Sequence, residues 1–322
     1  SIDIEMKYDP KQRGYLLDQY VGLSRRAASE NAPLDLIVWP ETMFPQVLYV
    51  EGPNTRMPEE WKSQQPRFRS YSQEDFQREL REVTARSRWP MENLAKQLDT
   101  PLLLGVSTVV LGDGDEQIFN SAAMVARDGT IVGRYDKMHR VLFGEYVPWS
   151  DEFPWLRRFT PVPSLIAAGE HAVSFPVAGL RIAPNICYET VLPHVIRRQV
   201  RELTERGEEP DVLVNLTNDG WFWGSSELDM HLVCGVFRAV ECRKPLLIAA
   251  NTGFSAWIDA NGVIRQQGRR RDTDVLVASV AASHRSSGYL AYGDWFAGVC
   301  LTACVVLAAS GLASRRQKPV KR

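Results

Sequence analysis

Continuous apolar runs alternate with charged, helix-like stretches along most of the chain. The runs DLIVW (35–39), LLLGVSTVV (102–110) and VLVNL (212–216) each predict a strand that is buried on both faces. Strands of that kind need helices packed on their sheets, and helical periodicity is found at 10–31 and 226–243. The pattern therefore predicts an α/β or α+β protein with layered sheets covered by helices.

Shorter apolar segments are separated by turn residues. Asp128-Gly129 lies between SAAMVA and TIVGRYD, and Gly179 lies between VSFPVA and LRIAPNICYE, so both pairs are predicted to form hairpins. LLIAANTG and SAWIDANGVI follow, the second turning at Asn261-Gly262. The run VLVASVA (275–281) is predicted to be the last strand.

The stretch between the first two strong strands has a different character. Residues 45–70 are rich in Pro, Gln, Arg and Ser and lack periodicity, which predicts a long irregular loop. Ser72 and Asp75 have the spacing of a capping box, so a helix is expected from there to Arg88. Pro90 is expected to interrupt it, and MENLAKQL to form a further short helix.

The C-terminal end predicts a membrane anchor. From Trp295 to Ala313 the chain has 19 residues without a charge, and a helix of that length spans roughly 28 Å, close to a bilayer's hydrocarbon core. Five basic residues follow in SRRQKPVKR. We therefore expect a transmembrane helix at 293–313, a basic cytoplasmic tail at 314–322, and a catalytic domain at 1–290 on the opposite, periplasmic side. The alternative is a buried core helix.

Composition and charge narrow the function classes. The 38 Lys and Arg residues nearly balance the 39 Asp and Glu residues, which argues against a polybasic nucleic-acid binder. With 44% apolar and 24% charged residues, whole-chain disorder is excluded. The five Cys residues form no CxxC or Cys/His cluster, so neither a disulfide scaffold nor a zinc site is predicted. Because Ser1 is no initiator Met and no signal-peptide pattern follows, a fragment or a processed form of a longer protein is expected.

Three side chains with complementary chemistry follow predicted strands. Glu41 comes after LIVWP, Lys137 after TIVGRYD and Cys187 after LRIAPNI. A Cys on a tight turn can act as a nucleophile, a carboxylate can take its proton, and an ammonium can stabilise an oxyanion. Together they suffice for acyl transfer through a thioester, although spacing alone does not bring them into contact. Inert burial of the thiol and surface positions for the other two are the alternatives.

Other candidate nucleophiles and bases are interpreted as structural. Cys234 and Cys242 lie eight residues apart on one predicted helix, which favours packing, and Cys300 and Cys304 fall within the apolar C-terminal span. His231, on the same predicted helix as the first pair, is interpreted as a satisfied core residue rather than a catalyst.

Three short motifs carry a family resemblance. WPE (39–41), YDKMH (135–139) and NICYE (185–189) resemble the signature segments of the carbon–nitrogen hydrolase, or nitrilase, superfamily. The resemblance implies a Glu-Lys-Cys triad in an αββα sandwich, here followed by one transmembrane helix.

Further segments resemble one branch, the apolipoprotein N-acyltransferases. They are FGEYVP (143–148), NDGWFWGSS (218–226), RAVECRKPLL (238–247), ANTGFSAWID (250–259) and YGDW (292–295). The branch also has a multi-span membrane domain before the catalytic domain, which this sequence lacks. The resemblance to this branch implies an enzyme of the bacterial cytoplasmic (inner) membrane that needs no metal or organic cofactor. Its partners would be a phospholipid acyl donor and a diacylglyceryl lipoprotein acceptor, with no nucleic acid.

The resemblance also implies roles for individual residues. Cys187 would carry the acyl chain as a thioester, Glu41 would be the general base, and Lys137 would hold the oxyanion. Glu145 and Glu189 match acidic positions that assist the triad.

Three aromatic residues are implied near the substrate. Tyr188 would shape the wall beside the nucleophile, and Trp221 and Phe222 match an aromatic loop at the mouth of the site, with core packing as an equal alternative for Trp221. Residues 46–91 look longer than the family usually has and could be an insertion or a lid.

Two other functions stay open at this point. One is an amidase of the same superfamily that hydrolyses a carbon–nitrogen bond, in which water replaces the amine. The other is a membrane-anchored binding module without catalytic activity.

Overall fold

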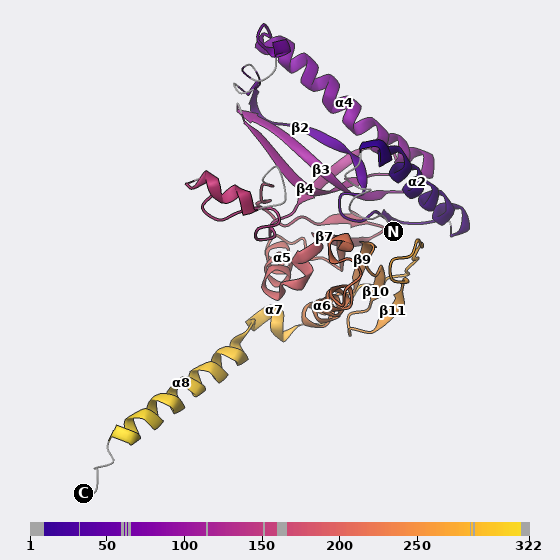
Figure 1. Cartoon of the computed structure of the whole chain (residues 1–322). Helices are drawn as coiled ribbons and strands as arrows, with labels where there is room; N and C mark the ends of the chain where they lie inside the picture. Colours follow the sequence, from indigo (N-terminus) through magenta and orange to yellow (C-terminus); the bar gives the residue numbers. More distant parts are fainter. Residues whose placement is uncertain are drawn as a thin grey trace, which may run out of the picture.

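The structure is a computed structural model that describes residues 10–31, 33–58, 61, 63, 66–113, 115–150, 152–159, 166–283, 285 and 287–316. Two sheets pack face to face, with helices on both outer faces, and one long helix leaves the domain at its C-terminal end (Figure 1). This is the αββα sandwich that the sequence predicts.

The first sheet has the order β1-β3-β4-β5, with β2 also paired to β3. Its strands are β1 (Ile37–Val38), β2 (Phe44–Arg56), β3 (Leu102–Asp113), β4 (Glu116–Val125) and β5 (Ile131–Asp136). β3 runs parallel to β1 and β2, whereas β3, β4 and β5 form antiparallel neighbours. Helices α2 (Arg13–Glu30) and α4 (Gln73–Leu98) cover its outer face (Figure 1).

The second sheet has the order β11-β10-β9-β8-β7-β6. Its strands are β6 (Phe175–Val177), β7 (Leu180–Ile186), β8 (Val212–Asn218), β9 (Leu246–Asn251), β10 (Ala256–Ile258) and β11 (Ile264–Gln267). β7, β8 and β9 are parallel, so their carboxyl ends lie at one edge of the sheet. Helices α5 (Pro193–Glu205) and α6 (Glu227–Cys242) pack on the outer face.

The remaining elements are short turns of helix and the C-terminal pair. They are η1 (Pro10–Gln12), η2 (Pro66–Phe68), η3 (Pro154–Phe159), η4 (Cys187–Val191), η5 (Asp219–Phe222), α7 (Gly288–Tyr292) and α8 (Trp295–Arg316).

The core between the sheets is built from the inward faces of both. Leu103, Met124 and Tyr135 of the first sheet pack against Ile186 and Val214 of the second, and all five are almost fully buried. The continuous apolar runs of the sequence are these strands, which are covered by the partner sheet on one face and by helices on the other.

The prediction of a loop at 45–70 is wrong for its first part. Residues 45–56 belong to β2, a 13-residue strand parallel to β3. Phe44 and Leu48 are buried in the outer core, so partner residues distant in sequence stabilise the strand. The segment expected to be an insertion or a lid, 46–91, thus contains most of β2 and much of α4.

Pro90 does not interrupt the second helix, which is also a correction. α4 begins at the predicted capping box of Ser72 and Asp75 and continues through Pro90 to Leu98. Because Met91 and Leu94 are buried against the first sheet, packing outweighs the single backbone hydrogen bond that a proline forfeits.

Two further predictions need correction. Residues 275–281 have no regular secondary structure and pair with no described strand; most of them line a cavity of about 660 Å³ beside α2 and β1. Apolar alternation becomes a strand only where a neighbouring edge takes its hydrogen bonds. Conversely, the sequence analysis missed α5, although Val195, Ile196, Val200 and Leu203 share one buried face.

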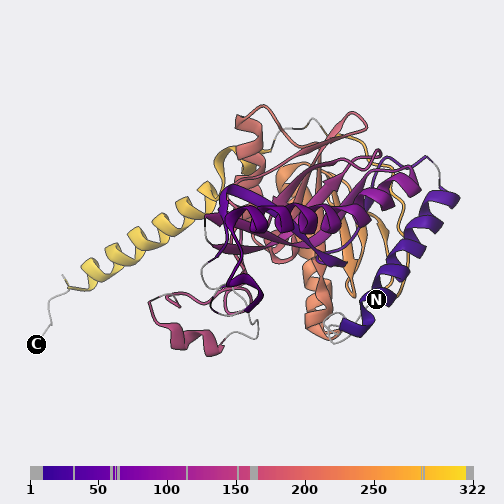
Figure 2. The same ribbon diagram turned by 90° about the horizontal axis from the view of Figure 1, so that it is seen from above.

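The apolar C-terminal segment forms α8, and no part of Trp295–Leu312 is buried in the domain. Among the described residues it is the helix whose length and composition suit a membrane span. Figures 1 and 2 both show it leaving the domain. The alternative of a buried core helix is therefore wrong. The predicted tail lies mostly outside the described residues, which end at 316.

Candidate active site

Glu41 is positioned by a tight turn that follows β1. Gly105 of β3 lies directly against this turn: a Cβ there would be 2.1 Å from the Pro40 oxygen and 2.7 Å from the Glu41 Cα. Only glycine permits such a close approach. The Glu41 side chain is almost fully buried and accepts two hydrogen bonds, from Asn120 Nδ2 at 2.6 Å and from the Asn218 backbone N–H at 2.9 Å. Because these donors belong to β4 and β8, the carboxylate bridges the two sheets.

Lys137 follows β5 and is one of the largest fully buried side chains in the described part of the chain. Its Nζ donates to Glu145 Oε1 at 2.8 Å and lies 3.7 Å from Glu41 Oε1. Burial opposes the ammonium charge, but the negative charges of Glu41 and Glu145 and the hydrogen bond to Glu145 outweigh it, and the pKa of Lys137 is raised above its usual value. The amine therefore stays protonated inside the site.

Glu145 also fixes the loop that carries it. Its Oε2 accepts the Val141 backbone N–H at 2.8 Å, while its other oxygen holds Lys137. The carboxylate thus orients the ammonium and ties it to the loop.

Cys187 occupies the sharp turn from β7 into η4 with a positive φ of 52°. This conformation costs an L-residue about 1 kcal/mol, so the surrounding structure must enforce it. Asn215 contributes by donating from Nδ2 to the Cys187 carbonyl at 3.2 Å.

The Cys187 thiol is held in its protonated form. Burial raises its pKa above the usual value, and the charge of Glu41 raises it further, against the opposing effects of Lys137 and Thr217. A thiol of this kind attacks a carbonyl only if a base removes its proton. Glu41 and Lys137 both lie near enough to change the charge state of the sulfur.

Glu189 ties the lysine loop to the cysteine turn. The carboxylate is fully buried and accepts the Tyr135 hydroxyl at 2.8 Å and the backbone N–H groups of Met138, His139 and Ile186 at 2.8, 2.9 and 2.7 Å. Met138 and His139 directly follow Lys137, and Ile186 precedes Cys187. Glu189 therefore fixes two of the three candidate catalytic residues relative to each other.

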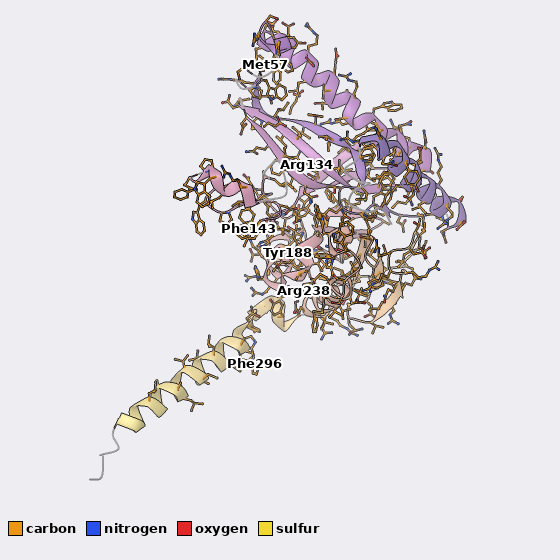
Figure 3. The ribbon with its side chains drawn as sticks, viewed as in Figure 1. Met57, Arg134, Phe143, Tyr188, Arg238 and Phe296 are labelled. Atoms are coloured by element: carbon orange, nitrogen blue, oxygen red, sulfur yellow. The ribbon has the colours of Figure 1, made fainter. Side chains whose placement is uncertain are left out.

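The predicted aromatic residues lie nearer the surface. Tyr188 is 38% exposed, and its ring centroid is 6.4 Å from that of His139. Figure 3 shows Tyr188 and Phe143 on the side of the domain from which the segment around η3 projects. Trp221 is 46% exposed and Phe222 is partly buried, both on η5. Core packing, the alternative for Trp221, is therefore wrong.

Three polar residues that hold the site together were not predicted from the sequence. Asn120, Asn215 and Asn218 all lie on strands and each binds a candidate catalytic residue. Asparagine inside an apolar run, as in VLVNLTN, was the available signal. His231 is buried and its Nδ1 is paired with Asp219, whereas its buried Nε2 makes no hydrogen bond within the described residues, so the expectation of a satisfied core residue holds for one ring nitrogen only.

Comparison with known proteins agrees with the fold and the motifs. The sequence pattern of the family described as carbon–nitrogen hydrolase matches residues 6–287. The apolipoprotein N-acyltransferase of Geobacter metallireducens is 33% identical over 98% of this chain and 53% of that protein. The enzyme of the same name from Rhodopirellula baltica is 30% identical over 84% of this chain and 50% of that protein. The chain thus spans about half the length of these relatives.

Solved structures support the same fold. The carbon–nitrogen hydrolase from Helicobacter pylori is 15% identical, with a TM-score of 0.53 over 81% of this chain and 82% of that one. Nit3 of Saccharomyces cerevisiae, a member of branch 10 of the nitrilase superfamily, is 14% identical, with a TM-score of 0.51 over 80% and 81%.

Proposed function

Because this chain belongs to the carbon–nitrogen hydrolase family, we propose that it is the catalytic part of an apolipoprotein N-acyltransferase. The enzyme would move an acyl chain from a phospholipid to the α-amine of the diacylglyceryl-cysteine of a lipoprotein. The observation that carries the proposal is the grouping of the buried Glu41 and Lys137 with the partly buried Cys187 in a domain that ends in a membrane-type helix. The names of the relatives support the same activity.

The first half-reaction forms the thioester. Glu41 takes the proton of the Cys187 thiol, and the sulfur attacks the ester carbonyl of the phospholipid. The ammonium of Lys137 stabilises the oxyanion of the tetrahedral intermediate. When this intermediate collapses, the carbon–oxygen bond breaks, and Glu41 returns the proton to the leaving hydroxyl of the lysophospholipid.

The second half-reaction transfers the chain to the acceptor. The neutral α-amine attacks the thioester carbonyl, Lys137 again stabilises the oxyanion, and Glu41 takes a proton from the nitrogen. The carbon–sulfur bond then breaks, the thiolate recovers the proton, and an amide and a free Cys187 thiol result. The raised pKa of the thiol supports this scheme, because it makes Cys187 depend on a base.

Supporting roles follow from the contacts. Glu145 would orient Lys137, and Glu189 would fix the cysteine turn. Tyr188 would form the wall beside the nucleophile, and the exposed Trp221 with Phe222 would contact the acyl chain near the mouth of the site. Apolar rings exposed to solvent suit such a chain.

The proposed location is the bacterial cytoplasmic membrane. α8, within the span 293–313, would anchor the catalytic domain of residues 1–290 on the periplasmic side, and the basic tail 314–322 would lie in the cytoplasm. Both proposed substrates reside in the bilayer, so an anchored domain meets them without leaving the membrane.

Intact-mass analysis of the full-length protein in detergent, incubated with phospholipid, tests the proposal. We expect a hydroxylamine-labile acyl adduct on Cys187 that an amine-bearing diacylglyceryl lipopeptide discharges. Cys187→Ala should abolish the adduct, whereas the matched variant Cys234→Ala should retain it. An adduct that water clears equally fast would indicate an amidase, and a folded protein with no adduct would indicate a binding module.

A further inference from the structure

Arg238, on α6, is a buried arginine to which the proposed reaction gives no role. It is the first residue of RAVECRKPLL, one of the segments that resemble the N-acyltransferase branch. The residue is 5% exposed, and a guanidinium group keeps its positive charge inside a protein. Burying such a charge costs free energy unless its N–H groups meet acceptors. The acceptors of Arg238 therefore indicate what the side chain does.

Two of these acceptors are backbone carbonyl groups at the end of η4. Nη1 of Arg238 donates to the Val191 oxygen at 3.1 Å and to the Thr190 oxygen at 3.3 Å. Because η4 begins at Cys187, the arginine binds the far end of the short helix that carries the candidate nucleophile.

The sequence explains why this end of η4 needs an outside donor. In a 3₁₀-helix the N–H group of residue i+3 bonds the carbonyl of residue i, as Leu192 does with Glu189 at 3.1 Å. The next donor in the series would belong to Pro193, which has no N–H group. Since Thr190 is fully buried, water is a poor substitute, and Arg238 supplies the missing donor.

A carboxylate on the same helix holds the other arm of the guanidinium. Nη2 of Arg238 donates to Glu241 Oε1 at 2.8 Å, three residues further along α6. This contact balances the buried charge. A planar guanidinium has its donors in a fixed fork, so the bond to Glu241 also directs Nη1 toward η4.

The strained residue lies at the opposite end of η4. Cys187 has a positive φ of 52°, which the surrounding structure must enforce. Glu189 and Asn215 hold the beginning of the turn, through the Ile186 N–H group and the Cys187 carbonyl. Arg238 holds its end. With both ends fixed, η4 cannot rotate to release the strain at the cysteine.

We propose that Arg238 is a positioning residue for Cys187: it binds the carbonyl groups that end η4 and so keeps the sulfur aligned with Glu41 and Lys137. It acts through the backbone of η4 and takes no part in proton transfer. The inference rests on the proposed role of Cys187 as the nucleophile. A displacement of about 1 Å in a reacting group can slow a reaction about 100-fold. Loss of Arg238 should therefore lower the maximal rate rather than weaken binding of the acyl donor.

The experiment measures the rate of acyl-adduct formation on Cys187 in the full-length protein in detergent, over a range of phospholipid concentrations. It compares Glu241→Gln with the double variant Arg238→Met/Glu241→Gln, which differ only at the arginine and leave no carboxylate without its partner. Glu241→Gln should keep the maximal rate within about threefold of the original, because its amide oxygen still accepts from Arg238. The double variant should have a maximal rate about 10 to 100-fold lower, with the half-saturating phospholipid concentration changed by less than about threefold.

Arg197→Met is the matched control. Arg197, on α5, also donates to two backbone carbonyl groups, those of Tyr289 at 2.8 Å and Ala291 at 3.2 Å, but these belong to α7. Amide hydrogen exchange, followed by peptide mass spectrometry, needs no acyl donor. It should become faster in peptides that cover η4 for the double variant and in peptides that cover α7 for the control.

Several results would overturn the proposal. They are unchanged exchange in η4 of the folded double variant, a maximal rate equal to that of Glu241→Gln, and an equal loss of maximal rate in Arg197→Met. If the double variant does not fold, Arg238→Lys replaces it, since the shorter ammonium does not hold Glu241 and both carbonyl groups together, and the same outcomes apply. A missing adduct in the unmodified protein would refute the proposed function, whereas the exchange pattern by itself tests whether Arg238 holds η4.

Discussion

Replacing Glu41 by Gln should change two reactions of Cys187, acyl transfer and alkylation by iodoacetamide, in opposite directions. The carboxylate is the proposed base for acyl transfer, yet its negative charge also raises the pKa of the thiol. Glutamine is nearly isosteric: its single oxygen can accept the Asn218 backbone N–H, and Asn120 can turn its amide so that its Oδ1 accepts from the new Nε2–H, so the turn should be preserved. The substitution removes the charge without emptying the site.

The size of the effect is scaled from the neighbouring Lys137–Glu41 pair. Two unit charges about 4 Å apart, as Lys137 and Glu41 are, interact by about 4 kcal/mol at an effective dielectric constant near 20. If a third of that energy reaches the thiolate, the pKa of Cys187 falls by about one unit and the thiolate fraction rises about tenfold. Loss of the general base should meanwhile slow acyl transfer by about 10² to 10⁴-fold.

Two assays on the same preparation separate these effects. The pH profile for alkylation of Cys187 by iodoacetamide, followed by peptide mass spectrometry, should move to lower pH in Glu41→Gln. Formation of the phospholipid-derived acyl adduct should become very slow. Glu51→Gln, on the exposed end of β2, serves as the control for a lost carboxylate. Slower alkylation of Glu41→Gln at every pH would refute the electrostatic reasoning, and unchanged acyl transfer would refute the assignment of the base.

Two further substitutions probe the scaffold of the site. Glu189→Gln replaces a carboxylate that accepts from four donors with an amide that has one oxygen. The lost hydrogen bonds, partly offset because a charge is no longer buried, should lower the free energy of unfolding by about 2–3 kcal/mol. A urea titration that matches the original protein would contradict this. Gly105→Ala should push the Pro40 oxygen away and displace Glu41, lowering stability by about 1–3 kcal/mol and reducing acyl transfer more than alkylation. Its control is Gly22→Ala in α2, where a Cβ meets nothing within 4 Å. Helix propensity predicts that this control raises the free energy of unfolding, measured by thermal denaturation, by up to about 1 kcal/mol.

The sequence predicted the parts of the fold that depend on local pattern. β3 and β8 are continuous apolar runs, and the capping box at Ser72 begins α4 as expected. β2 was missed because its stability comes from pairing with β3, and the passage of α4 through Pro90 depends on contacts with the first sheet. Neither contact leaves a signature in the segment itself.

The candidate site shows the same division between residue type and contact. Strand ends and residue chemistry made Glu41, Lys137 and Cys187 candidates with alternatives open, and the family resemblance of their motifs singled them out. The groups that hold them could not be assigned, because Asn120 and Asn218 reach Glu41 from strands far away in the sequence. Only the closed sandwich defines which asparagine meets which carboxylate.

The division of the site between the two sheets links its activity to the packing of the sandwich. Glu41 and Lys137 come from the first sheet, whereas Cys187 comes from the second. Two carboxylates join the halves: Glu41 accepts the backbone N–H of Asn218, and Glu189 accepts donors on both sides of the interface. If the sheets begin to separate, each carboxylate loses its hydrogen-bond donors while apolar groups still largely surround it. A buried charge without partners costs several kcal/mol per group. A sandwich that is partly open is therefore both unstable and inactive, and loss of acyl transfer on denaturation should coincide with unfolding of the domain rather than precede it.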